Sequence, residues 1–154
     1  MKKILILMML LLNVAVMASD NKYQGATSTN TVGFLQGGGG LIGVDYEQMV
    51  SDRWGVSVGI GLPSYGASIH YHIEPSIVSN SIALSYWNQG FEESESSRYL
   101  GLTYVFRSKT SGWSGQVGLG SVLFRGTTAK EDLEAIFGSD LPSVIALYSI
   151  GYMF

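Results

Sequence analysis

Cysteine is absent from this chain of 154 residues, and proline occurs only three times. The absence of cysteine excludes the disulfide framework of many small exported domains, and it also excludes a lipoprotein anchored through an N-terminal cysteine. Long apolar runs are missing too, because the longest one, at residues 4–17, is interrupted by Asn13. It falls short of the roughly 18 to 20 apolar residues that a membrane-spanning helix needs. A helical membrane protein is therefore excluded.

The N-terminal apolar run has the features of a secretory signal peptide. Lys2 and Lys3 precede it, small residues follow it, and we expect cleavage before Ser19. Removal of the two lysines lowers the net charge from −3 to −5, which argues against nucleic acid as a partner. The expected division of the chain is a cleaved signal peptide at 1–18, an N-terminal extension at 19–28 and a single domain at 29–154.

Alternation of large apolar and small residues is the dominant pattern of the mature chain. The stretch "WGVSVGIGL" at residues 54–62 places tryptophan, valine, isoleucine and leucine on one face, and only glycine and serine on the other. A period of two residues is typical of β-strands. Related patterns occur at residues 42–47, 65–73, 82–86, 100–107, 113–123 and 146–154.

The two faces of these strands indicate which side meets solvent. A soluble β-sandwich would bury its large residues and expose charged ones. Here the second face is mostly glycine and serine, which lack both the bulk to fill a wide core and the charge of a solvated surface. Small residues inside and large ones outside describe a narrow barrel surrounded by lipid.

Periplasmic turns and outer connections alternate along the chain if residues 37–40 and 63–64 are counted as outer connections. Short periplasmic turns are expected at residues 51–53, 74–76 and 108–112, and longer outer connections at 88–97 and 125–141, with further outer connections at 37–40 and 63–64. This arrangement predicts an all-β fold, an eight-stranded antiparallel up-and-down transmembrane barrel with both termini in the periplasm. The first strand is expected near residues 29–36; if residues 33–49 formed one long strand instead, the count would be seven.

Aromatic residues sort by their position along the strands. Amphipathic rings gather at membrane interfaces, and this chain carries two such groups. Those predicted beside the periplasmic turns or terminus are Trp54, Tyr71, Phe106, Trp113, Tyr152 and Phe154, and those toward the outer ends are Phe34, Tyr65 and Tyr86.

The most specific motif is at the end of the sequence, where Tyr148, Ile150, Tyr152 and Phe154 alternate up to a final aromatic residue. With the strands of residues 29–154, the chain resembles the small eight-stranded outer-membrane barrels of Gram-negative bacteria, the OmpX-like and OmpA transmembrane domain-like group. The segment "GVDYEQMVSDRWGVSVGIG" is similar to the strand, tight turn and strand of that group. The resemblance implies location in the cell outer membrane and recognition of the C-terminal motif by the outer-membrane assembly machinery.

Five polar side chains are predicted to face the lumen: Asp45, Glu47, His70, His72 and Arg107. Two histidines at alternate positions of one strand share a face, and with carboxylates they could hold a divalent metal such as zinc. The alternative is a structural network, because acids and bases in a narrow lumen must compensate one another. We favour the network and expect no cofactor.

Two features of the sequence could indicate an enzyme, namely the histidine pair and a glycine-rich stretch. Some small outer-membrane barrels are lipid A deacylases or acyltransferases, but His70 and His72 are predicted to face the lumen and so cannot serve a lipid in the outer leaflet. The glycine-rich stretch at residues 38–43 formally matches a dinucleotide fingerprint, yet a strand follows it where a helix is required. We expect no enzymatic activity.

The last outer connection is predicted to contain a short helix at residues 129–137. Thr128 and Glu131 have the spacing of a capping box. Its apolar residues Leu133, Ile136 and Phe137 are expected to cover the barrel mouth, with contact to a partner as the alternative.

These observations favour a structural or surface-interaction protein with a filled lumen, because an eight-stranded barrel is too narrow for a general porin. The alternatives are an outer-leaflet lipid-modifying enzyme, a narrow gated channel and a soluble exported β-protein. The expected partners are outer-membrane lipids and lipopolysaccharide, with the assembly machinery during biogenesis, and the expected state is a monomer.

Overall fold

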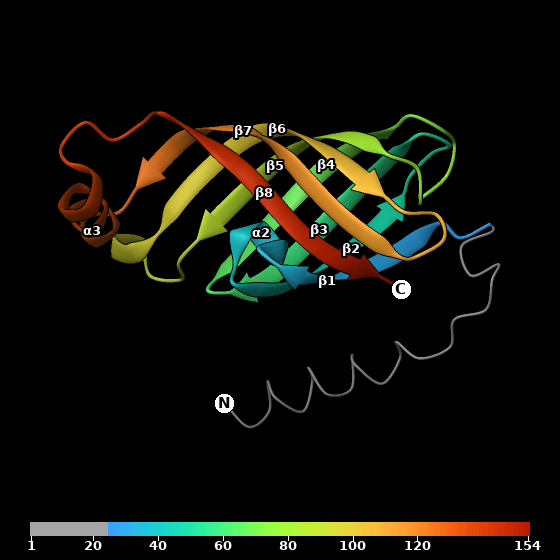
Figure 1. Cartoon of the computed structure of the whole chain (residues 1–154), viewed down its shortest axis with the longest axis horizontal. Coiled ribbons are helices and arrows are strands. Elements are labelled where there is room, and N and C mark those ends of the chain that lie inside the picture. Colours follow the sequence, from blue (N-terminus) through green and yellow to red (C-terminus); the bar gives the residue numbers. More distant parts are fainter. Residues whose placement is uncertain (1–24) are drawn as a thin grey trace, which may run out of the picture.

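The computed structural model describes residues 25–154, so the predicted signal peptide lies outside the described residues. Eight antiparallel strands form a closed barrel in which each strand pairs with its neighbours in sequence, and β8 returns to β1 (Figure 1). The expected all-β antiparallel barrel of eight strands is confirmed. The strands are β1 (Ser28–Phe34), β2 (Ile42–Met49), β3 (Trp54–Leu62), β4 (Ser64–His72), β5 (Ser81–Gln89), β6 (Ser97–Arg107), β7 (Trp113–Arg125) and β8 (Val144–Met153).

Three short helical segments join these strands: α2 (Gln36–Gly39), η1 (Glu93–Glu95) and α3 (Thr127–Phe137). The segment α2 separates β1 from β2, so the alternative of a single long strand, with seven strands in all, is wrong. Within residues 25–154, none of the helices has the length and apolar character to span a membrane.

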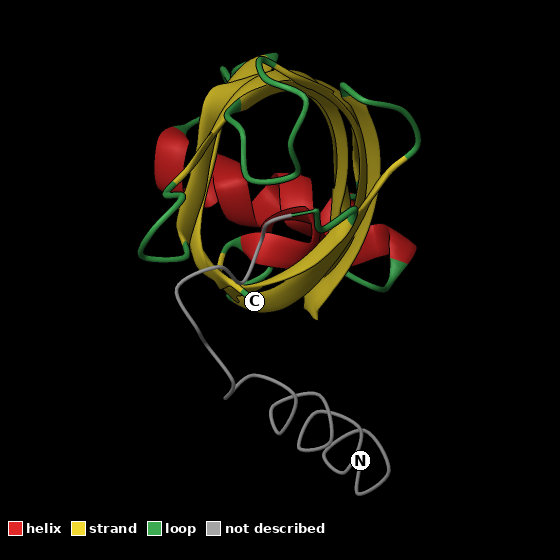
Figure 2. Ribbon diagram, turned by 90° about the vertical axis from the view of Figure 1, so that its right-hand side faces the viewer, coloured by secondary structure: helices red, strands yellow, loops and turns green. Residues whose placement is uncertain are grey.

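Inward and outward positions alternate along each strand as the sequence pattern predicts. In β5, Ser81, Ala83 and Ser85 are buried, whereas Ile82 and Leu84 between them are exposed. Antiparallel pairing places like faces opposite each other. Viewed from one end, the strands form a ring (Figure 2). The exposed large apolar side chains therefore lie on the outer side of this ring.

The two ends of the barrel differ. One end, here called the terminal end, carries the β2–β3, β4–β5 and β6–β7 connections and residue Phe154, whose backbone pairs with Asn30 through hydrogen bonds of 2.9 and 3.1 Å. The other end, here called the helix end, carries η1 and α3. In Figure 1 the helix α3 lies beyond the strands at the opposite end from the C-terminus.

Aromatic side chains gather at the terminal end. Trp54 packs edge-on against Tyr71 across β3 and β4, with ring centroids 5.2 Å apart, and Trp113 packs in the same way against Tyr152 at 6.0 Å. All four rings, and that of Phe106, are exposed on the outer surface. Rings thus line the outer rim of the barrel beside the β2–β3, β4–β5 and β6–β7 connections.

The seam between β1 and β8 is the shortest strand pairing in the barrel. It contains four residue pairs, from Thr31–Met153 to Phe34–Ile150, whereas β6 and β7 share eleven. The chain leaves β1 at Leu35, which adopts a left-handed conformation with φ 57° and turns the chain into the lumen. Residues 144–149 of β8 are consequently paired with β7 alone.

The helix α3 corrects two expectations about the last outer connection. It begins at Thr127 after Gly126, and no side chain caps its first turn, so the predicted capping box of Thr128 and Glu131 is wrong. Ile136 and Phe137 are 73% and 70% exposed, and no residue of α3 is buried, so they do not cover the mouth. Gly126 donates a backbone hydrogen bond of 2.8 Å to Ser96, which holds the start of α3 beside η1, away from the lumen.

Candidate functional site: the lumen of the barrel

Glu47 of β2 is the centre of a buried charged cluster in the lumen. One carboxylate oxygen accepts a hydrogen bond from Nε2 of His72 at 2.8 Å, and the other is paired with the guanidinium of Arg107. All three side chains are almost fully buried. Glu47 is thus compensated on both oxygens, as a carboxylate removed from water requires.

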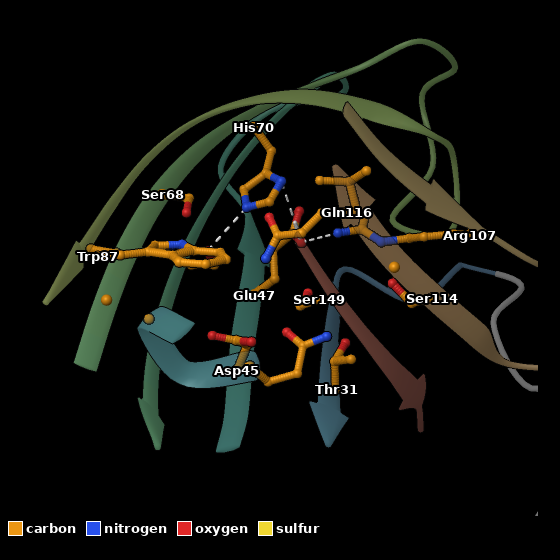
Figure 3. Close-up of a pocket in the computed structure, with 17 residues that line it drawn as sticks. Thr31, Asp45, Glu47, Ser68, His70, Trp87, Arg107, Ser114, Gln116 and Ser149 are labelled. Atoms are coloured by element: carbon orange, nitrogen blue, oxygen red, sulfur yellow. Dashed lines mark hydrogen bonds and ion pairs between the residues drawn. The ribbon is translucent and has the colours of Figure 1, made fainter. Parts of the chain in front are cut away.

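His70 lies next to this cluster. Its Nδ1 atom is 3.8 Å from a carboxylate oxygen of Glu47 (Figure 3). The same Nδ1 atom is 3.3 Å from the hydroxyl of Ser81, while Nε2 is 3.0 Å from the hydroxyl of Ser57. The order hydroxyl, imidazole and carboxylate is that of a hydrolytic triad, but the imidazole is too far from Glu47 for a direct hydrogen bond. Ser57 was not predicted as a site residue, although it alternates with the outward residues of β3.

Asp45 is held apart from the charged cluster. Both of its carboxylate oxygens accept a hydrogen bond from the backbone N–H of Gly37, at 3.1 and 3.2 Å. The structure therefore brings Glu47, His70, His72 and Arg107 together and gives Asp45 a different partner, the segment α2. The reason is that the chain after β1 folds into the lumen, which the alternation pattern did not show.

The segment α2 fills the lumen toward the helix end, where the sequence analysis expected an outer connection. Ser64 donates a hydrogen bond of 2.6 Å to the carbonyl of Gly37, and Gln89 donates one of 3.0 Å to that of Gly39. A Cβ atom added at Gly38 would lie 2.0 Å from the backbone oxygen of Tyr65. Only glycine allows the backbone of α2 to approach the barrel wall this closely.

The terminal end of the lumen is filled by the β4–β5 connection. A short turn was expected at residues 74–76, but the connection spans residues 73–80 and turns inward. Ile77 and Val78 are buried there against Met153, and the carbonyl of Ile77 accepts a hydrogen bond of 2.7 Å from Arg107. Apolar side chains therefore cover the charged cluster on that side. Figure 2 shows a loop folded across the barrel opening.

A cluster of large residues inside the barrel was missed by the sequence analysis. Trp87, Tyr99 and Leu147 pack together inside the lumen toward the helix end. Leu147 occupies the space beside Gly101 and Gly120, where an added Cβ would be 2.7 to 2.8 Å from its side chain. The alternation that makes Ser81, Ala83 and Ser85 face inward also directs Trp87 inward, so the pattern contained this signal.

Between these filled regions the lumen keeps a small polar cavity of about 40 Å³. Figure 3 shows Glu47, His70 and Gln116 directed into it. Within residues 25–154, Ser149 Oγ and Arg107 Nε are buried here without a hydrogen-bond partner. A cavity of this size holds a few water molecules and is too small for an acyl chain.

The same residues were considered as metal ligands. Among residues 25–154, no group of three or more histidine, aspartate or glutamate side chains lies close enough to hold a metal ion. Asp45 is engaged by Gly37, and Glu47 by His72 and Arg107. The geometry therefore fits a structural network better than a metal centre.

Comparison of the chain with protein-family models, with curated proteins and with solved structures finds no match.

Proposed function

We propose that the chain is an OmpX-like barrel of the Gram-negative outer membrane, with a structural or surface-interaction role and no catalytic activity. The observation that carries the proposal is the outer surface of the strands. Within β1–β8, Arg98 is the only charged residue at an outward position. Large side chains such as Val58, Ile60 and Leu119 are more than 60% exposed there.

Such a surface is suited to lipid. A soluble monomer seldom exposes a contiguous apolar patch of more than a few hundred Å², whereas here apolar residues surround the barrel. Transfer of one large apolar side chain from water to an apolar environment stabilises a protein by about 1.5–3 kcal/mol. The polar lumen, the outward rings beside the connections of the terminal end and the seam closed by Phe154 accord with the same proposal.

The filled lumen argues against a general porin. The segment α2 and the β4–β5 connection occupy its two ends, and only the small polar cavity remains between them. A narrow gated channel remains a second candidate, because few side-chain hydrogen bonds hold α2 to the wall. Ser64 and Gln89 donate to carbonyls of α2, and Asp45 accepts from the N–H of Gly37. A lipid-modifying enzyme is less well supported, because both histidines are directed inward.

We propose outer-membrane lipids, lipopolysaccharide and the assembly machinery as partners, with both termini in the periplasm and the barrel as a monomer. Expression in a Gram-negative host, followed by membrane fractionation and gel electrophoresis with and without heating, tests location and fold together. We expect recovery with the outer membrane and a change in migration on heating. Extraction by buffer alone would overturn the proposal.

A further inference from the structure

An apolar groove runs over the outer surface of β5, β6 and β7. The groove is shallow and largely open, and about 710 Å³ of space lies over its lining residues. Leu100 and Leu102 of β6 and Leu119 of β7 are among its lining residues. A groove of this size and character fits a hydrocarbon chain.

The floor of the groove is the backbone between the rows of outward side chains, at inward-facing positions such as Gly101, Gly118 and Gly120. Ser121, which is outward and pairs with Leu100, is the small residue nearest the helix end of the groove. Other small outward residues are Ala67 of β4 and Ala146 of β8.

A single cation lies just beyond the groove toward the helix end. Arg98 occupies the same face of β6 as Leu100, two residues further along the strand, and successive residues on one face are about 6.6 Å apart. Its guanidinium lies 4.6 Å from the ring centroid of Phe124, and its Nε donates a hydrogen bond of 3.2 Å to Asn88. These contacts position the cation while its side chain remains partly exposed.

One acidic side chain competes for this cation. The carboxylate of Glu93 in η1 lies 3.8 Å from Nη2 of Arg98, but it is 77% exposed. An exposed ion pair of this kind contributes about 0–1 kcal/mol. Glu93 can therefore be replaced at the guanidinium by another anion.

We propose that this surface binds one molecule of a phosphate-bearing outer-leaflet lipid, the lipid A part of lipopolysaccharide, with an acyl chain in the groove and a phosphate at Arg98. The inference rests on the proposed location in the outer membrane and names a specific lipid site on the barrel. Charge complementarity supports this occupant, because Arg98 is the only outward charge of the strands and lies at the end of the groove. Arginine binds phosphate through paired, charge-assisted hydrogen bonds.

The test measures lipid binding to the purified barrel in an uncharged detergent, by native mass spectrometry and by titration. The probes are bisphosphorylated lipid A, its dephosphorylated form and phosphatidylcholine. We expect one bound lipid A per barrel and clearly weaker binding of the other two lipids. Equal binding of all three, or saturation only with many molecules, would overturn the proposal, as would dimerisation of the barrel through this face.

Two pairs of matched variants locate the site. Arg98→Gln should weaken lipid A binding about fivefold, the effect of one cation near an anionic surface, whereas Arg125→Gln at the same end of the barrel should leave it unchanged. Ser121→Trp should fill the groove and abolish binding, whereas Ala67→Trp on β4, a strand that does not line the groove, should not. Equal losses within either pair would overturn the assignment.

The direction in which a third variant changes lipid A binding distinguishes a phosphate site from a purely structural role of Arg98. Glu93→Gln removes the competing carboxylate and should strengthen lipid A binding, while a structural ion pair would give no gain. Heat-modifiable migration of every variant reports folding. If the wild-type barrel fails that assay, the proposed membrane function fails; if it passes and lipid A does not bind, only this inference fails.

Discussion

Glu47 and Arg107 are sixty positions apart in the sequence and form an ion pair between β2 and β6 inside the barrel. Both side chains are almost fully buried, and His72 holds the second carboxylate oxygen. The pair therefore links two strands that are not neighbours in the sheet. Each charge compensates the other, and removal of either one would leave a buried charge without a counter-ion.

Replacement of one partner tests this role. Glu47→Gln leaves Arg107 charged and buried, and we expect a loss of about 3–5 kcal/mol in the free energy of unfolding. Unfolding in urea, followed by tryptophan fluorescence in detergent, measures it. Glu74→Gln is the control, because Glu74 pairs with Lys109 at 2.5 Å on the exposed surface, where a pair contributes about 0–1 kcal/mol. Equal losses of unfolding free energy in Glu47→Gln and Glu74→Gln would show that the buried ion pair contributes no more than the exposed one.

The segment α2 should depend on the absence of side chains. Gly38 and Gly138 share a φ of 84°, but a Cβ at Gly38 would meet the backbone of Tyr65, whereas nothing lies within 4 Å of one at Gly138. Gly38→Ala should therefore displace α2 and raise single-channel conductance in a planar bilayer. Gly138→Ala, whose backbone at φ 84° and ψ 179° is no more favourable for alanine, should leave conductance unchanged. An unaltered conductance of Gly38→Ala would show that displacement of α2 alone does not open the lumen, and it would contradict the gated-channel candidate.

The final aromatic residue should matter for assembly. Phe154→Ala is expected to reduce the amount of heat-modifiable protein in the outer membrane, since the resemblance assigns this residue to the assembly signal. Phe34→Ala serves as the control because Phe34 is an aromatic residue at the end of β1, exposed on the outer surface. Quantitative blotting of outer-membrane fractions gives the measurement. Similar yields of the two variants would contradict a role of the C-terminal motif in assembly.

The exposed residues of α3 should contribute little to barrel stability. Ile136 and Phe137 project from a helix without any buried residue, so serine at both positions should change the free energy of unfolding by less than about 0.5 kcal/mol. Leu147→Ser, inside the lumen, should lower it by several kcal/mol, about 2–5 by analogy with other large-to-small core changes. A large loss in the α3 variant would indicate a contact that the fold does not contain.

The strands could be predicted from sequence because each has two chemically different faces. The alternation in residues 54–62 gave β3 with the same boundaries that the structure shows. The same kind of alternation in β2, β4 and β6 correctly predicted that Glu47, His70, His72 and Arg107 face inward. A period of two residues therefore determines the direction of a side chain wherever the strand is regular.

The segments inside the lumen could not be predicted in the same way. Residues 36–39 and 73–80 have no period, and their glycines or apolar residues suit either a surface turn or an inward one. Their direction is set by what the finished barrel offers, such as the Asp45 carboxylate for Gly37 and the space beside Met153 for Ile77. Such contacts between distant parts of the chain are invisible to local patterns.

The short seam between β1 and β8 has a consequence for the order of events in folding. All other strand pairs join segments that follow one another, and they can form by local zipping, whereas the pair Thr31–Met153 closes a loop of more than one hundred residues. Contacts of such long sequence separation form slowly because the entropy of the whole loop must be lost first. With only four residue pairs to offset that loss, closure is the natural kinetic bottleneck. A curved, open sheet is the species that should accumulate just before it.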